Sequence, residues 1–284
     1  ISSNNSLDTS LAKADDVITL TLTSSENIQT PTISMSIGGT SVSPTVSGSN
    51  SSWTATYTVI DGINGSVSFS IDFNDLANNA GAQVTNTTNS SSVNVDTTSP
   101  TVSSFTMSDS ALKSGDTATV SIQFSEEVIS FSNSNMTVPN GTLSTLTSSD
   151  NINWSAVYTP NTNVEDTTNE LTINNSYTDL AGNSGSSLST SNFTIDTVTP
   201  TLTTVSLSSN NSLDTSLAKA NDVVTLTFTA SETIQTPTVV FQSNGLSIND
   251  SSITYVNTSG NTWIASYIVY SSDSNGSVSY TIDY

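Results

Sequence analysis

The 284-residue chain has no cysteine, no histidine and no arginine, and lysine occurs only three times. Without cysteine the chain cannot form a disulfide scaffold, although this does not fix its compartment. Without histidine or cysteine, neither a Ser-His-Asp nor a Cys-His catalytic arrangement can be built. Paired carboxylates could serve a glycosidase, but here the carboxylates recur with the scaffold, so we expect the protein not to be an enzyme.

Acidic residues dominate the charge: 24 Asp and Glu against the three lysines give a formal net charge of −21. This balance excludes a basic surface for nucleic acid and an electrostatic anchor on anionic lipid. No apolar run approaches the ~18 residues of a membrane-spanning helix. We therefore expect neither a nucleic-acid partner nor membrane insertion.

The chain contains an internal repeat, because Ser2–Thr32 returns almost unchanged at Ser208–Thr238. A third, more diverged copy lies between them. The period is about 100 residues, the size of one immunoglobulin-type sandwich. The aligned positions are Lys13, Lys113 and Lys219; Asp16, Asp116 and Asp222; Glu26, Glu126 and Glu232; Trp53, Trp154 and Trp263; and Tyr57, Tyr158 and Tyr267.

Apolar and polar residues alternate with period two, and no stretch has a helical period. Trp53, Ala55, Tyr57 and Val59, for example, alternate with three threonines. Turn signals such as Asn-Gly separate these runs at the spacing of short strands. The fold class predicted is all-β, a tandem array of Ig-like antiparallel β-sandwich domains, with the repeated tryptophans in the cores.

Three repeats are predicted: the first at residues 1–98 with an incomplete first strand, the second at 99–198, and the third at 199–284 without its C-terminal strand. These limits fit a window from a longer array. An open sandwich completed by a strand from a neighbour is the alternative. An Asp, a few small residues and Pro100 or Pro200 link successive repeats, which predicts short, stiff links and an end-to-end rod.

Three motifs recur in fixed order: Gly115-Asp116 through Glu126, the Asp179-Leu-Ala-Gly-Asn183 turn, and the Asp196-Thr-x-x-Pro200 linker. With these the whole chain resembles the bacterial Ig-like repeats of giant extracellular adhesins. The resemblance implies a sandwich fold and an extender role between a cell-surface anchor and a distal binding domain, often rigidified by calcium. The first repeat departs from the pattern at Asn78, where the family turn usually has Gly.

Sandwich topology brings the loop after the second strand, the loop before the last strand and the incoming linker to one end of each repeat. Several oxygen ligands meeting there suit Ca²⁺, which takes 6–8 of them. Alternatively, these side chains serve only the turns. The candidate metal-binding residues are Asp96, Glu126, Asp179 and Asn183 around the second repeat, Asp196 and Glu232 around the third, Glu26 and Asp75 in the first, and Asp16 and Asp116 at the opposite ends.

Other features have ordinary interpretations. Each lysine precedes the Asp that opens the second strand and is expected to be solvated, rather than buried in a Lys–Asn isopeptide crosslink. The tryptophans fit a core better than a sugar-binding platform. Asn-x-Ser/Thr triplets such as that at Asn50 matter only if the source cell glycosylates.

The composition and the resemblance together predict an extracellular, cell-surface structural protein, the extender of a long repetitive adhesin whose partners are neighbouring repeats. One alternative is a subunit of a self-assembling filament, sheath or surface layer, with like chains as partners. Another is a glycan- or ice-binding module, for which the row Thr54, Thr56, Thr58 is the nearest candidate face.

Overall fold

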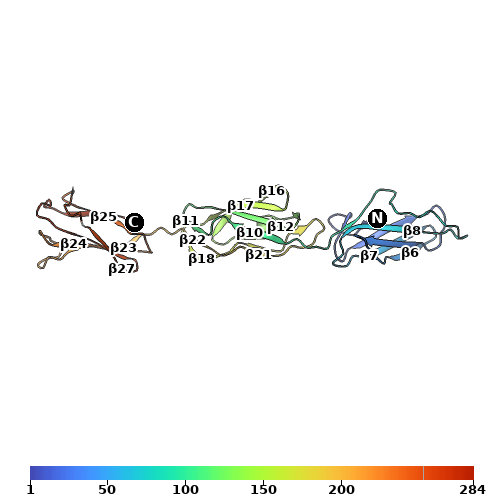
Figure 1. The fold of residues 1–284 in the computed structure, drawn as a ribbon, viewed down its shortest axis with the longest axis horizontal. Helices are drawn as coiled ribbons and strands as arrows, with labels where there is room; N and C mark the ends of the chain where they lie inside the picture. The colour runs from blue at the N-terminus through green and yellow to red at the C-terminus, as the bar shows by residue number, and fades with distance from the viewer. Residues whose placement is uncertain (252) are drawn as a thin grey trace. The chain divides into compact units, whose positions relative to one another are not determined.

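The computed structural model describes residues 1–251 and 253–284, and in them strands and turns alternate without an α-helix (Figure 1). The chain divides into two compact units, Ile1–Thr197 and Val198–Tyr284. The first unit holds the first two repeats, and the second holds the third. The limits of the individual repeats at residues 98 and 198 stay a prediction.

Two sheets form the first repeat. One has the order β1-β3-β7-β6, and the other has the order β2-β9-β8-β4-β5. Their strands are β1 (Ser2–Ser3), β2 (Leu11–Ala12), β3 (Val17–Thr23), β4 (Thr32–Ile37), β5 (Thr40–Val42), β6 (Thr45–Ser49), β7 (Ser52–Thr58), β8 (Gly65–Asp72) and β9 (Asn94–Val95).

The second repeat is built from a main sheet, β10-β12-β17-β15 with β16 added to β17, and from smaller sheets opposite it. Its elements are β10 (Val102–Met107), β11 (Ala111–Lys113), β12 (Ala118–Phe124), β13 (Val128–Ile129), the 3-10 helix η1 (Asn133–Asn135), β14 (Met136–Thr137), β15 (Gly141–Leu143), β16 (Thr147–Ser148), β17 (Asn153–Pro160), β18 (Glu165–Asn169), β19 (Thr172–Ile173), β20 (Thr178–Asp179), β21 (Leu188–Ser189) and β22 (Phe193–Asp196).

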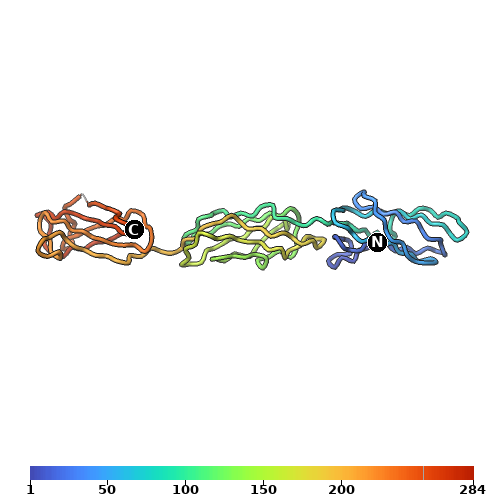
Figure 2. Tube along the Cα trace, turned by 90° about the horizontal axis from the view of Figure 1, so that it is seen from below, coloured from blue at the N-terminus to red at the C-terminus, as the bar shows by residue number. Residues whose placement is uncertain are grey.

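The third repeat has one sheet with the order β23-β24-β28-β27 and another with the order β26-β25-β29. Figure 2 shows its chain, orange to red, as extended segments that run back and forth. Its strands are β23 (Leu202–Ser209), β24 (Val223–Ala230), β25 (Thr238–Ser243), β26 (Leu246–Ser247), β27 (Thr254–Ser259), β28 (Thr262–Ile268) and β29 (Val278–Asp283).

The apolar residues that alternate with polar ones along the strands form the hydrophobic cores, as the sequence predicted. In β12 every second residue, from Ala118 to Phe124, is buried and the residues between are exposed. Side chains at i and i+2 lie on one face of a strand, so this pattern gives a sheet with one apolar face. Three separate hydrophobic clusters result, each drawn from a single repeat.

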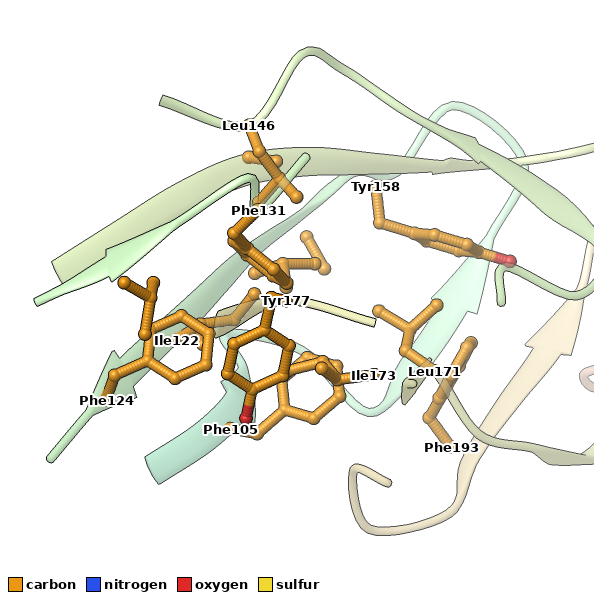
Figure 3. Packing of buried hydrophobic residues seen from close by; sticks show 14 of the residues in the cluster. Phe105, Ile122, Phe124, Phe131, Leu146, Tyr158, Leu171, Ile173, Tyr177 and Phe193 are labelled. Carbon is orange, nitrogen blue, oxygen red and sulfur yellow. The ribbon is translucent and has the colours of Figure 1, made fainter. Parts of the chain in front are cut away.

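Aromatic rings dominate the core of the second repeat (Figure 3). The ring of Phe124 lies 4.9 Å from those of Phe131 and Tyr177, edge-on to the first and tilted to the second. Tyr158 is fully buried, its hydroxyl donates to the Pro139 carbonyl at 2.8 Å, and burial raises its pKa to about 12. Edge-to-face rings of this kind add to the free energy gained by area burial.

The prediction of core tryptophans is confirmed for Trp53 and Trp263, which are 8% and 9% exposed. Trp154 is instead half-buried and packs against the rim of its cluster, edge-on to Phe131. Beside it, Phe131 is 5% exposed and Tyr177 is completely buried, whereas Phe73, the counterpart of Tyr177 in the first repeat, is only partly buried.

Phe124→Ala should destabilise the second repeat by about 3–5 kcal/mol, because it removes a ring packed between two others and leaves a cavity. Urea unfolding followed by tryptophan fluorescence measures this loss. Val157→Ala is the matched control: Val157 lies in the neighbouring strand β17 but is 42% exposed, so the change should be within about 0.5 kcal/mol. Equal midpoints for the two variants would contradict the core assignment.

Candidate metal centre at the contact between the first two repeats

Three carboxylates from separate parts of the chain meet within the first unit. Asp96 follows the closing strand β9 of the first repeat, whose Val95 is buried in the core. Glu126 follows β12 of the second repeat, and Asp179 ends β20. One carboxylate oxygen from each residue lies within 4.8 Å of the others. Among the described residues this is the only such group of three acidic side chains.

The turn after Asp179 holds that carboxylate in a fixed orientation. Asn183 donates to it twice, from its backbone N–H at 2.8 Å and from its side-chain amide at 2.7 Å. Gly182 has φ +89°, a left-handed conformation that glycine adopts without strain. Asp179 is 1% exposed, so its carboxylate is held at the contact and not in bulk water.

The same asparagine connects the two repeats. The Asn183 side-chain amide also donates to the backbone carbonyl of Asp96 at 2.9 Å. Asn183 therefore acts here as a hydrogen-bond donor that ties two carboxylate-bearing segments together. The sequence predicted it as a metal ligand, and nothing in the geometry tests that role.

Ionised Glu126 is destabilised by its surroundings in the cluster. Burial raises the pKa of its carboxyl, and the negative charges of Asp96 and Asp179 raise it further. No hydrogen-bond donor to this side chain is present in the described part of the chain. Like charges ~4 Å apart repel by about 1 kcal/mol in bulk water and by about 4 kcal/mol near a protein surface. A divalent cation would reverse the sign of this interaction.

A second contact, which the sequence analysis missed, joins the same two repeats. The Asn5 side-chain amide donates to Asp16 Oδ2 and to the backbone carbonyl of Ala181, both at 2.8 Å. Asn5 and Ala181 are 5% and 2% exposed, so this hydrogen bond is shielded from water. A Cβ at Gly182 would lie 3.2 Å from Leu7 Cδ1, so the turn fits closely against the first repeat.

The equivalent turn of the first repeat, Asp75–Asn79, has the same internal hydrogen bonds. Asn79 donates to Asp75 from its backbone N–H and from its side-chain amide, both at 2.7 Å, and these bonds lower the Asp75 pKa. Asn78 has φ +71° at the position of Gly182. Glu26 and Asp75 line one hollow of about 170 Å³. The structure therefore brings these two predicted residues to the same place.

Asp16 and Asp116 close turns. Asp16 Oδ2 accepts from the Lys13 backbone N–H at 2.9 Å, and Asp116 Oδ2 accepts from the Lys113 backbone N–H at 3.1 Å. These hydrogen bonds agree with the alternative interpretation, in which both aspartates stabilise turns. Lys113 and Lys219 are exposed, as expected for solvated lysines, and Lys13 is half-buried.

The last two predicted metal ligands, Asp196 and Glu232, lie in different compact units of the chain. Asp196 ends β22 in the first unit, and Glu232 follows β24 in the second. A cation site that joins them stays a prediction.

The threonine row proposed as a ligand-binding face lies on the outer side of β7. Thr54 and Thr56 pair with Thr21 and Thr19 of β3, so threonines lie opposite one another on the two strands. Thr58 is exposed and the other two are half-buried. This is ordinary for the solvent face of a sheet rich in β-branched residues.

The topology defines the chain as an array of Ig-like β-sandwiches. Residues 96–195 match the family model described as a bacterial Ig-like domain. Among solved structures the chain is similar to the I9–I11 tandem from titin, with a TM-score of 0.34, 11% identity and coverage of 96% of this chain and 89% of that one. It is also similar to the mouse nectin-like molecule 4 ectodomain (Ig1–Ig3), with a TM-score of 0.30, 12% identity and coverage of 96% and 90%. No curated protein shows a significant match. The described residues include no helix long and apolar enough to cross a membrane.

Glu126→Gln should stabilise the calcium-free protein at pH 7, because it removes the carboxylate that its neighbours repel. The folded-state pKa of Glu126 lies above its ordinary value of 4.5. The destabilisation by ionised Glu126 is therefore complete above the raised pKa and is relieved as the pH falls through it towards 4.5. The difference in Tm between variant and wild type should be largest near pH 7 and shrink as the pH falls through that window.

Thermal scans with a chelator at several pH values measure this difference, which for a unit of this size amounts to about 2–4 °C per kcal/mol. Glu127→Gln is the control, because it removes the same charge from the adjacent, exposed residue. An equal effect of both variants would show that net charge, and not the cluster, is responsible.

Proposed function

We propose that this chain is part of the extender of a long bacterial cell-surface adhesin, in which Ig-like repeats hold a distal binding domain away from the cell. The role is structural: the repeats set the distance between the cell and the distal domain, and the orientation of that domain. Three sandwiches of one type in tandem and a high net negative charge suit an extracellular stalk.

The contact between the first two repeats supports this role most directly. Freely jointed domains would meet through exposed linkers, whereas here Asn5 and Asn183 make hydrogen bonds to backbone carbonyls across a closely packed contact. Leaving the buried Ala181 carbonyl unsatisfied would cost about 1–3 kcal/mol. The contact therefore favours one relative orientation of these two repeats.

Calcium is the cation we propose for the cluster. Asp96, Glu126 and Asp179 offer hard carboxylate oxygens, and Ca²⁺ accepts backbone carbonyls and water as further ligands. Bound there, the cation would offset the repulsion that raises the pKa of Glu126. It would then stiffen the junction, because one ligand comes from the first repeat and two come from the second.

Calcium should therefore raise the Tm of the first unit and narrow the range of shapes seen by small-angle scattering, and a chelator should reverse both effects. Asp96→Asn combined with Glu126→Gln should abolish the response to calcium. Asp116→Asn, at the equivalent turn of the second repeat and outside both the cluster and the contact, is a control that should keep the response. Superimposable scattering profiles with calcium and with chelator would contradict the metal role.

The Asn5 contact should stiffen the junction independently of the cation. Asn5→Ala leaves the buried Ala181 carbonyl without its donor, so the first two repeats should reorient more freely even in calcium. Asn211→Ala removes the equivalent side chain of the third repeat, which donates to Asp222 at 2.8 Å, and serves as the matched control. Residual dipolar couplings of the first two repeats measure the effect. If Asn5→Ala leaves them unchanged, Asn5 does not orient the repeats.

A further inference from the structure

The sheet β23-β24-β28-β27 of the third repeat ends at β27, which pairs only with β28 among the described residues. The corresponding strands of the first two repeats, β6 and β15, are also the outermost strands of their sheets. A free edge is therefore part of this sandwich in all three repeats. Such an edge presents backbone N–H and C=O groups to which another chain can pair.

The first two repeats have features that hinder pairing at this edge. In the first, β6 follows Pro44 and contains Gly48, which has φ +138°. In the second, the edge is broken into the short strands β15 and β16. There the Asn133 side chain donates to the Ser144 carbonyl and accepts from the Leu146 N–H, both at 2.9 Å. Proline, glycine and interruption are ordinary protections of an edge strand.

The edge of the third repeat lacks these protections. Strand β27 has six residues, all exposed, and none of them is proline, glycine or charged. Its pairing with β28 is regular from Thr254 to Asn257 and shifts register after that. The Tyr255 hydroxyl donates to the Val239 carbonyl of the facing sheet at 3.2 Å, which fixes the strand to the sandwich. The edge is thus ordered and open.

An apolar pair lies on the outer face of the same edge. Val256 is 51% exposed and pairs with Ile264 of β28. The first repeat has Ser47 and Thr54 at these two positions. Ile268 lies on the same face of β28 and is 44% exposed. The third repeat therefore exposes apolar side chains where the first repeat exposes hydroxyls.

We propose that β27 pairs with β27 of a second copy of this chain, antiparallel and centred on Val256. In that register Val256 lies opposite its counterpart, Thr254 lies opposite Thr258, and Tyr255 lies opposite Asn257. Side chains alternate between faces along a strand, so outer-face residues meet outer-face residues. The two pairs of Val256 and Ile264 then form one apolar strip across the two-fold axis.

The distribution of charge favours a like chain as the partner at this edge. With a net charge of −21, two copies repel each other wherever their carboxylates approach. Neither β27 nor β28 has a charged residue, so two copies can meet there without opposing carboxylates. A two-fold interface uses the same edge of both copies, so association stops at the dimer. This pairing goes beyond the proposed extender function.

Sedimentation equilibrium of the full chain tests the pairing. We expect a monomer–dimer equilibrium that tightens as salt screens the repulsion between copies. Val256→Asp and Val256→Lys should each weaken dimerisation at least tenfold, because each places two like charges opposite one another. An equimolar mixture of these two variants should restore the dimer, which also shows that both fold. Val240→Asp, at a valine 46% exposed on the other sheet, should dimerise like the wild type.

A disulfide tests the register. The chain has no cysteine, so Val256→Cys introduces a single thiol. Residues directly opposite on antiparallel strands have Cα atoms about 4.5–5.5 Å apart, which suits a disulfide. Mild oxidation should therefore crosslink Val256→Cys at least tenfold faster than Val240→Cys, and urea should remove this difference.

A chain that stays monomeric at millimolar concentration in high salt would overturn the proposal. So would equal dimerisation of the Val256→Asp and Val240→Asp variants, or a mixture of the two Val256 variants that stays monomeric. Assemblies larger than a dimer would also overturn it, because they need a second interface. None of these outcomes bears on the extender function.

Discussion

The arrangement of the candidate site depends on one hydrogen bond, from the Asn183 side chain to the backbone carbonyl of Asp96. This bond joins a turn of the second repeat to the end of the strand that closes the first. Because the same amide also binds Asp179, it brings the Asp96 and Asp179 segments together, and Glu126 lies beside them. The acidic cluster is thus a consequence of how the repeats join.

Two opposing terms act at this contact. Packing of Gly182 against Leu7 and the hydrogen bonds of Asn5 and Asn183 favour contact, and carboxylate repulsion opposes it. Neither term dominates by a wide margin, since each amounts to a few kcal/mol. A change in the charge of the cluster therefore alters the stability of this contact.

The sequence predicted the fold class and the central cluster because both follow from topology. Alternation along the strands placed the core residues, and the known course of a sandwich placed Asp96, Glu126 and Asp179 at one end. The sequence did not predict the Asn5 contact. Asn5 lies in a loop that is shorter in the second repeat, so an alignment of the three repeats has no residue equivalent to Asn5 there. The near-identical Asn211 loop of the third repeat was the available signal.

Trp154 was misplaced because alignment gives a position along a strand but not the volume around it. The second repeat has Phe131, edge-on to the indole, where the first repeat has Pro31, and the indole lies at the rim of the cluster. The sequence predicted Asp16 and Asp116 as metal ligands because an acidic residue near the end of a repeat can either bind a cation or stabilise a turn. Each accepts a backbone N–H of its own turn in the structure, and their role as ligands stays a prediction.

The loop that makes the Asn5 contact has the same internal hydrogen bonds in the third repeat. Asn211 accepts from the backbone N–H of Leu213 at 3.0 Å, as Asn5 does from Leu7 at 2.9 Å, and both donate to the following aspartate. The loop therefore has the same hydrogen-bonded conformation in both repeats. A loop that is already ordered loses little conformational entropy on contact. Short, ordered polar turns can therefore contribute to the contact between two sandwiches in a chain with only 33% hydrophobic residues.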